Sequence, residues 1–137
     1  MAEKGKTKER YFYSWEEFEK DTEKLAVWAK NQNFRAIYGV PRGGVVLAIS
    51  LSHRLNLPAE FSKEKIDERT LLVDDISDSG KTLLALEKAL SFKPVVATIF
   101  YHEDTMRKPD FCVRKKEKWV IFPWETEETS KYDNRNL

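Results

Sequence analysis

Apolar positions along the chain follow two spacings, one typical of amphipathic helices and one typical of buried strands. After a polar, mixed-charge stretch over residues 1–10, apolar side chains recur at helical spacing across residues 15–31. Ser14 and Glu17 at the start of that stretch fit a capping box. Short apolar runs of strand length then alternate with further helical segments. The predicted strands are 36–40, 58–62, 70–75 and 95–100, and the predicted helices are 15–31, 45–55 and 82–90.

Strands that alternate with helices predict an α/β fold with a mostly parallel central sheet flanked by helices. Ligands in such folds bind beyond the carboxyl ends of the strands, and two informative turns, 41–44 and 76–82, fall at those ends. The pattern weakens after residue 100, where only WVIF (119–122) predicts a further strand. We expect residues 1–137 to form a single domain, with peripheral tails at 1–10 and 126–137.

Composition restricts the classes of function. The chain has 41% hydrophobic and 34% charged residues and a net charge of +1, so no overall field favours nucleic acid or a membrane surface as a partner. One cysteine, Cys112, excludes an intrachain disulfide framework and a cysteine-based zinc site. Neither a signal peptide nor a stretch able to span a bilayer is evident, so we expect a cytoplasmic protein.

The segment LLVDDISDSGKTL (71–83) has the most specific pattern in the chain. An apolar run ends in the paired carboxylates Asp74 and Asp75, and Asp78 then precedes a turn of small residues that opens into a helix. Gly80 permits a tight turn, and the backbone N–H groups of residues 78–82 can converge on an anion at the positive end of the helix dipole. The segment therefore suits binding of a sugar together with its phosphate.

The same segment has features in common with three other kinds of site. A nucleotide-triphosphate P-loop requires a glycine five residues before Gly80, where Asp75 stands, so that interpretation is rejected. Phospho-accepting receiver domains also carry paired aspartates at a strand end, but they do not continue into DSGKT. A solvated acidic strand end without a ligand is the simplest alternative.

A second turn, Pro41-Arg42-Gly43-Gly44, has a composition suited to phosphate oxygens. Glycines let the backbone approach a ligand closely, and an arginine pairs well with phosphate. Taken alone, the two glycines are equally compatible with a simple connection between strand and helix.

Residues 74–82 resemble the signature of the type I phosphoribosyltransferases, which bind phosphoribosyl pyrophosphate (PRPP). The stretch KWVIFPWE (118–125) is similar to the base-binding stretch of xanthine-guanine phosphoribosyltransferases, and KPDF (108–111) resembles hypoxanthine-guanine enzymes. The resemblance runs from about residue 11 to residue 125. It implies the type I phosphoribosyltransferase fold with a small C-terminal base-binding appendage.

The resemblance also implies roles for the residues around PRPP. Asp74 and Asp75 hold the ribose hydroxyls, which carboxylates accept in charge-assisted hydrogen bonds. The Arg42–Gly43 peptide, often cis in that family, contacts the departing pyrophosphate. Asp78 additionally serves as general base toward the purine. The residues implied for the 5′-phosphate are Asp78, Ser79, Gly80, Lys81 and Thr82.

For the base and the metal, the resemblance implies a further set of residues. Trp119 stacks on the purine, and Val120 offers backbone contacts. His102 stands where 6-oxopurine enzymes usually carry a lysine, and it can donate to the purine oxygen. The Mg²⁺ that accompanies PRPP lies near Asp74, Asp75 and Glu125. For Trp124 we expect a place in an aromatic core cluster instead.

The implied activity is transfer of the 5-phosphoribosyl group from PRPP to a 6-oxopurine (guanine, xanthine or hypoxanthine), in purine salvage, with release of pyrophosphate. The partners are PRPP and a purine base or its nucleotide, and the family commonly forms homodimers or homotetramers. One departure is the short connection 62–69, where the family usually inserts a long loop that closes over the site. The alternative is a non-catalytic sensor of PRPP or nucleotide. Transfer to a pyrimidine or to adenine is disfavoured by the 119–125 stretch.

Overall fold

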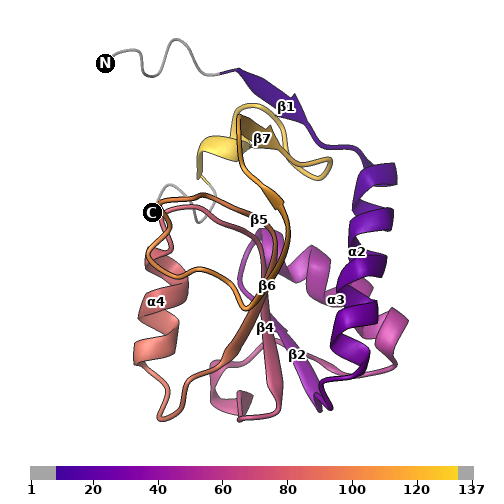
Figure 1. Cartoon of the computed structure of the whole chain (residues 1–137), viewed down its shortest axis with the longest axis vertical. Coiled ribbons are helices and arrows are strands. Elements are labelled where there is room, and N and C mark those ends of the chain that lie inside the picture. Colours follow the sequence, from indigo (N-terminus) through magenta and orange to yellow (C-terminus); the bar gives the residue numbers. More distant parts are fainter. Residues whose placement is uncertain (1–8, 133–137) are drawn as a thin grey trace.

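The computed structural model describes residues 9–132, which form a twisted parallel sheet with helices on both faces (Figure 1). The five strands lie in the order β3-β2-β4-β5-β6, and every neighbouring pair is parallel. The strands are β2 (Ala36–Gly39), β3 (Ala59–Glu60), β4 (Thr70–Ser77), β5 (Val95–Tyr101) and β6 (Phe111–Lys115). The predicted parallel α/β architecture is confirmed.

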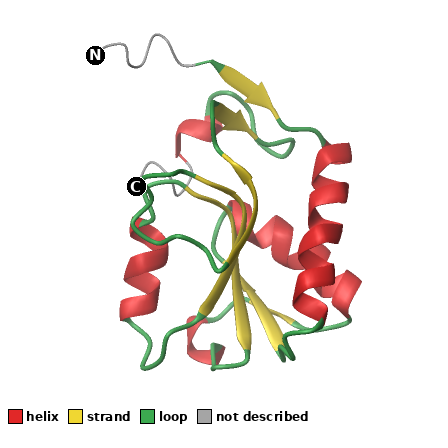
Figure 2. Ribbon diagram, viewed as in Figure 1, coloured by secondary structure: helices red, strands yellow, loops and turns green. Residues whose placement is uncertain are grey.

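Two helices cover one face of the sheet and one covers the other (Figure 2). The helices α2 (Trp15–Lys30) and α3 (Gly43–Leu55) contribute to the larger hydrophobic cluster, whereas α4 (Lys81–Lys88) packs on the opposite face through Leu83 and Leu86. The capping box at the start of α2 is present, with Ser14 and Glu17 bonding each other's backbone N–H groups. No helix of residues 9–132 is long and apolar enough to cross a bilayer.

Strand β4 is the central element because both β2 and β5 pair with it. All eight of its residues are buried, including Asp74 and Asp75 near its carboxyl end. The strand is two residues longer than the hydrophobic pattern predicts, since backbone pairing with β5 continues through Ser77. The two carboxylates therefore project from a rigid strand and not from a loop.

A second, two-stranded sheet joins distant parts of the chain. Strand β1 (Arg10–Phe12) pairs in parallel with β7 (Trp119–Ile121), and a short 3₁₀ helix, η2 (Thr129–Tyr132), follows. The predicted C-terminal appendage thus includes an N-terminal strand that the sequence pattern did not indicate. Residues 126–137 were expected to be peripheral, yet Ser130 is fully buried within that range. Residues 1–8 and 133–137 lie outside the described part of the chain.

The connection from β3 to β4 is as short as the sequence suggested, and it is held in place. It contains a 3₁₀ turn, η1 (Lys63–Lys65). The guanidinium of Arg35 donates to the Asp67 carboxylate over 2.8 Å and to the Lys65 carbonyl over 3.2 Å. Residues 62–69 therefore pack against the end of the sheet that is opposite to the carboxyl ends of the strands.

Candidate active site

The two informative turns meet at the carboxyl end of β4. An ideal Cβ built on Gly43 lies 1.9 Å from Oδ2 of Asp75, and one on Gly44 lies 2.6 Å from the carbonyl oxygen of Val73. Such distances are far below van der Waals contact, so these two positions accept only glycine while β4 keeps its place. The glycine pair does more than connect β2 to α3, because it lets the backbone of the Arg42 turn contact Asp74 and Asp75.

The Arg42 turn also faces the C-terminal segment. Its peptide bond between Pro41 and Arg42 is cis, one bond before the Arg42–Gly43 peptide expected from the resemblance. Arg42 donates to the carbonyl oxygen of Thr129 over 3.4 Å. The Arg42 turn and the C-terminal segment border a cleft of about 320 Å³. It is lined by Arg42, Gly43, Val46, Trp124, Glu125 and Thr129. The position expected for pyrophosphate is therefore bordered by the turn and by Glu125.

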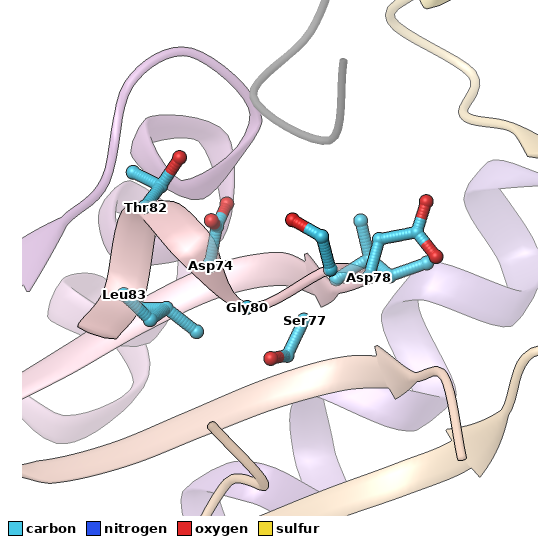
Figure 3. A pocket seen from close by; sticks show the side chains of 8 residues that line it. Asp74, Ser77, Asp78, Gly80, Thr82 and Leu83 are labelled. Atoms are coloured by element: carbon cyan, nitrogen blue, oxygen red, sulfur yellow. The ribbon is translucent and has the colours of Figure 1, made fainter. Parts of the chain in front are cut away.

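The turn after β4 has the geometry of an anion-binding loop. Gly80 adopts a left-handed conformation (φ 83°) as the residue that precedes α4, and the backbone N–H of Lys81 donates to Ser79 Oγ over 3.2 Å. Residues of this turn line a small hollow at the N-terminus of α4. Figure 3 shows the Asp74 carboxylate and the Thr82 hydroxyl on one side of this hollow and the Asp78 carboxylate turned the other way. The helix dipole and the backbone N–H groups favour a phosphate there.

The connection between β5 and β6, residues 102–110, packs directly against this turn. The backbone N–H of Met106 donates to the Ser79 carbonyl over 2.8 Å, and Ser77 Oγ lies 2.7 Å from Thr105 Oγ1. An ideal Cβ on Gly80 lies only 2.4 Å from the same Thr105 oxygen. Gly80 is therefore required for two reasons, its positive φ and its close contact with residues 105–107.

A buried arginine fixes the shape of residues 102–110. Arg107 is 7% exposed, and its guanidinium bonds to Glu87 on α4 over 2.5 Å and to the Pro94 carbonyl over 3.0 Å. A third bond, of 2.6 Å, reaches the carbonyl oxygen of Lys108. Because a buried guanidinium needs partners for its donors, this set of bonds holds the connection against α4.

The expected base-binding side of the site is built on β7. Trp119 donates its indole N–H to Ser130 Oγ over 3.1 Å, so the turn of η2 fixes the ring. The neighbouring Val120 is buried and pairs with Tyr11 of β1. Trp124 lies in an aromatic cluster, stacked on Phe122 with ring centroids 5.0 Å apart, as expected for a core residue.

Lys116 joins the expected base-binding side to Asp78. Its ammonium lies 3.0 and 2.9 Å from the two carboxylate oxygens of Asp78 and 4.7 Å from the centre of the Trp119 ring. Both charged side chains are largely shielded, with 12% of Lys116 and 14% of Asp78 exposed. His102, by contrast, accepts the backbone N–H of Asp104 at its Nδ1 over 3.0 Å, within its own turn.

A buried polar network connects the appendage to the main sheet and to α2. Tyr13 is 2% exposed and donates to Asp21, which also accepts from Arg114 over 2.6 Å. Burial raises the pKa of the Tyr13 hydroxyl well above its ordinary value, and the hydrogen bond to Asp21 acts in the same direction. Tyr13 therefore remains a neutral donor, and it links the segment after β1 to α2 and β6.

Comparison with known proteins agrees with this geometry, although no protein-family model matches the chain. A solved purine phosphoribosyltransferase from Pyrococcus horikoshii superposes with a TM-score of 0.74 and 30% identity, over 85% of this chain and 95% of that one. The chain belongs to the type I phosphoribosyltransferase family. The xanthine-guanine-hypoxanthine phosphoribosyltransferase of Helicobacter pylori gives the same TM-score at 27% identity, over 90% of this chain and 99% of that one.

Curated members of the family are similar over most of their length. The xanthine-guanine phosphoribosyltransferase of Idiomarina loihiensis is 27% identical over 140 residues, which cover 84% of this chain and 86% of that protein. The enzyme of the same name from Cereibacter sphaeroides is 26% identical over 156 residues, which cover 91% and 92%. The resemblance to the xanthine-guanine branch of the family, seen in the sequence, is thereby confirmed.

The structure brings most of the predicted site residues together around the carboxyl end of β4. The Arg42 turn meets Asp75, and Asp74 lines the same hollow as residues 78–80 and Thr82. His102 is held in its own turn, while the cation beside Trp119 is Lys116. The ligand contacts assigned to all these residues stay predictions.

The carboxylates at the site suit a substrate-borne Mg²⁺. Within residues 9–132 no three histidine, cysteine or acidic side chains form a ready-made metal site. Mg²⁺ keeps several waters and is commonly held by one or two carboxylates together with substrate phosphates. Asp75 contacts the Arg42 turn, Asp74 lines the hollow of residues 78–82, and both side chains carry oxygens of the kind that Mg²⁺ prefers, although each is only 1% exposed. Glu125 lines the cleft from the appendage.

Sequence reasoning missed three residues that shape the site: Lys116, Arg107 and Ser130. Lys116 lies in a run of charged residues, RKKEK (114–118), that reads as solvated surface. Arg107 gave no periodic signal, and Ser130 belongs to a polar stretch. The KPDF resemblance beside Arg107 was the one available indication that this connection has a structural role.

Proposed function

We propose that the protein transfers the 5-phosphoribosyl group from PRPP to a 6-oxopurine base, giving the purine nucleotide and pyrophosphate. The observation that carries the proposal is the contact of Gly43 with Asp75, because it unites two turns that each suit one end of PRPP. The family and the names of its similar members support phosphoribosyl transfer to a purine. Guanine, xanthine and hypoxanthine are the expected acceptors.

PRPP would lie across the carboxyl end of β4. Its 5′-phosphate would bind at the hollow of residues 78–82, at the N-terminus of α4, where the helix dipole favours an anion. Its ribose hydroxyls lie in reach of the two carboxylates at the end of β4. Its pyrophosphate fits beside Arg42 and Gly43, in the cleft that Glu125 borders. Asp74 and Asp75 would hold Mg²⁺, which neutralises charge on the departing pyrophosphate.

The reaction then depends mainly on alignment. The bond from C1′ to the pyrophosphate oxygen breaks with its electron pair leaving on pyrophosphate, and a purine ring nitrogen forms the new bond to C1′. The proton released from that nitrogen passes to the Asp78 carboxylate. Trp119 holds the purine plane by stacking, which places its nitrogen in line with C1′.

A second candidate is a sensor that binds PRPP or nucleotide without turnover. The short 62–69 connection supports it, because Arg35 holds these residues at the far end of the sheet, away from the site. A long closing loop would shield the cationic transition state from water, and this chain has none at that position.

One assay tests both candidates. The protein is incubated with PRPP, Mg²⁺ and guanine, xanthine, hypoxanthine, adenine or uracil, and nucleotide formation is followed chromatographically. Formation of a 6-oxopurine nucleotide is expected in the wild type. The paired change Asp74→Asn and Asp75→Asn should abolish it, whereas Glu103→Gln with Asp104→Asn removes two exposed acids nearby and should leave it intact. PRPP binding by calorimetry without product on any base would favour the sensor.

The proposal includes two expectations on context. We expect a homodimer or homotetramer, which light scattering at assay concentration measures. We also expect the enzyme to act in the cytoplasm, in purine salvage, where cell fractionation and growth on a purine base as sole source test it.

A further inference from the structure

We propose, building on the function above, that Ser130 is a positioning residue that makes the purine base and pyrophosphate bind cooperatively. It belongs to a turn, residues 126–130, that follows β7 and contacts both halves of the proposed site. Ser130 Oγ accepts the indole N–H of Trp119 over 3.1 Å. The preceding residue, Thr129, accepts a bond from the Arg42 guanidinium at its carbonyl oxygen over 3.4 Å. Two neighbouring residues thus join the expected stacking ring to the arginine expected at pyrophosphate.

The 126–130 turn is closed by its own polar groups. The backbone N–H of Thr129 donates to Thr126 Oγ1 over 3.0 Å, and that of Thr126 donates to Thr129 Oγ1 over 2.9 Å. The backbone N–H of Ser130 donates to the Thr126 carbonyl over 3.0 Å, and its hydroxyl donates to the Glu127 carbonyl over 2.9 Å. Because these bonds fix Thr129 and Ser130 relative to each other, a displacement of one residue moves the other.

The buried attachment of the turn is at Ser130. Residues 126–129 are exposed, whereas Ser130 is fully buried. Glu127 also forms an ion pair with Arg10 of β1, but the two side chains are 54% and 50% exposed, and exposed pairs contribute little to stability. A short exposed segment with few buried contacts has low local stability. The position of the turn therefore depends on what binds at its exposed side.

Pyrophosphate would bind at that exposed side. The cleft expected to hold it is lined by Thr129 together with Arg42. A guanidinium has five N–H donors in a planar fork, so Arg42 can bind phosphate oxygens while its Nη2 keeps the Thr129 carbonyl. The bound anion would fix the guanidinium, and the guanidinium would fix the turn.

The purine would depend on the buried side of the same turn. Stacking requires the Trp119 ring to lie parallel to the purine plane, and the bond from its indole N–H to Ser130 favours one orientation of the ring. A turn held by pyrophosphate keeps Ser130 in place and so keeps the ring in that orientation. By linkage, the bound purine must strengthen pyrophosphate binding by the same factor.

The test measures binding without turnover. Labelled hypoxanthine is bound by equilibrium dialysis with and without pyrophosphate and Mg²⁺, and no transfer can follow because neither ligand contains ribose. In the wild type, pyrophosphate should lower the Kd of hypoxanthine by about 5-fold or more, the lower end for coupled sites. In Ser130→Ala this coupling factor should fall below about twofold. Glu128→Gln, on an exposed residue of the same turn, should keep the wild-type factor. Thermal unfolding confirms that each variant is folded.

A second variant tests the other end of the connection. Arg42→Lys keeps a cation at the cleft but lacks the planar fork, so it should reduce the coupling factor as Ser130→Ala does. Because both changes interrupt the same connection, the double variant should lose no more coupling than either single variant. A further loss in the double variant contradicts a connection that runs through the turn.

The remaining outcomes separate this proposal from the proposed transfer. If Ser130→Ala weakens hypoxanthine binding equally with and without pyrophosphate, Ser130 only supports the fold and the proposal is wrong. A wild-type coupling factor near one, or no hypoxanthine binding in either condition, also overturns it. Cooperative binding by a protein that forms no nucleotide from PRPP refutes transfer and supports the coupling. Nucleotide formation with a coupling factor near one refutes the coupling alone.

Discussion

Gly43 lies against the carboxylate of Asp75 with no room for a side chain between them. This contact brings together two turns that are separated in sequence by the whole of α3 and β3. It explains why glycine stands at the first residue of α3, since any Cβ there would clash with Asp75. The contact is also the simplest place to disturb the proposed PRPP site without changing a charge.

The change Gly43→Ala should weaken PRPP binding. The new methyl group must push either the Arg42 turn or Asp75 out of position, and overpacking of this kind corresponds to a rise in Kd of about 10-fold or more. Calorimetry with PRPP and Mg²⁺ measures the change. The control is His53→Ala, on an exposed position of the same helix. An unaltered PRPP affinity in Gly43→Ala would show that the contact does not shape the site.

The change Asp78→Asn should reduce turnover with guanine or xanthine by roughly 10²- to 10⁴-fold, because the amide cannot accept the purine proton. Binding of the 5′-phosphate should persist, since the backbone of residues 78–82 provides most of its donors. Steady-state kinetics and ribose 5-phosphate binding separate the two effects. Asp104→Asn, on the exposed adjacent connection, is the control. Normal turnover in Asp78→Asn removes this residue from the role of base.

The change Arg107→Met should lower the free energy of unfolding by about 2–3 kcal/mol, because it leaves Glu87 and two carbonyl groups without their charged donor. Affinity for ribose 5-phosphate should fall as well, since residues 102–110 hold Ser79 and Gly80. Urea unfolding and calorimetry provide the two measurements. Lys108→Met changes the neighbouring side chain but keeps the carbonyl that Arg107 bonds. If it costs as much stability as Arg107→Met, the bonding scheme is wrong.

Glu17 gives a prediction on pH. Burial opposes its ionisation, but hydrogen bonds from Tyr11 and Ser14 outweigh that effect and lower the pKa of Glu17 below its ordinary value of 4.5. A carboxylate with a lowered pKa in the folded state stabilises the protein above the unfolded-state value, and this contribution disappears as the pH falls through the folded-state value. The stability lost in Glu17→Gln should therefore be largest at neutral pH.

The corresponding measurement is urea unfolding of the wild type and of Glu17→Gln across the acidic range. Their difference should shrink as the pH drops below about 4.5. Glu16→Gln removes a charge from the same turn of α2 at an exposed position and controls for the helix dipole. A difference that stays constant down to acid unfolding contradicts the prediction.

Local patterns were sufficient for the central part of the fold. The capping box, the buried run of β4 and the two turns all depend on neighbouring residues, so the sequence predicted them. Strands β1 and β6 were missed for a common reason. Each is a short edge strand whose mixed sequence gains its pairing from a distant segment, β7 for β1 and β5 for β6. Tertiary pairing decided these elements.

The residues of the candidate site also divide into those that a local motif indicates and those that only tertiary packing brings together. Asp74, Asp78 and Arg42 stand in short motifs whose residues are close together in the sequence, so the sequence alone indicated them. Lys116 stands in a charged run where nothing local distinguishes it from Lys115. Only the path of the backbone from β6 to β7 turns one of these lysines onto Asp78 and Trp119. A residue such as Lys116 can be recognised as part of the site only from the three-dimensional structure.

The pairing of β1 with β7 has a consequence for the order in which parts of the site form during synthesis of the chain. The proposed contacts to ribose and its phosphate come from residues 74–82, and residues 102–110 hold Ser79 and Gly80 in place, so this part of the site needs the chain only as far as residue 110. Trp119 acquires its support only when β7 joins β1 and Ser130 reaches the indole. The proposed ribose-phosphate part of the site would therefore be assembled during synthesis before Trp119 is supported.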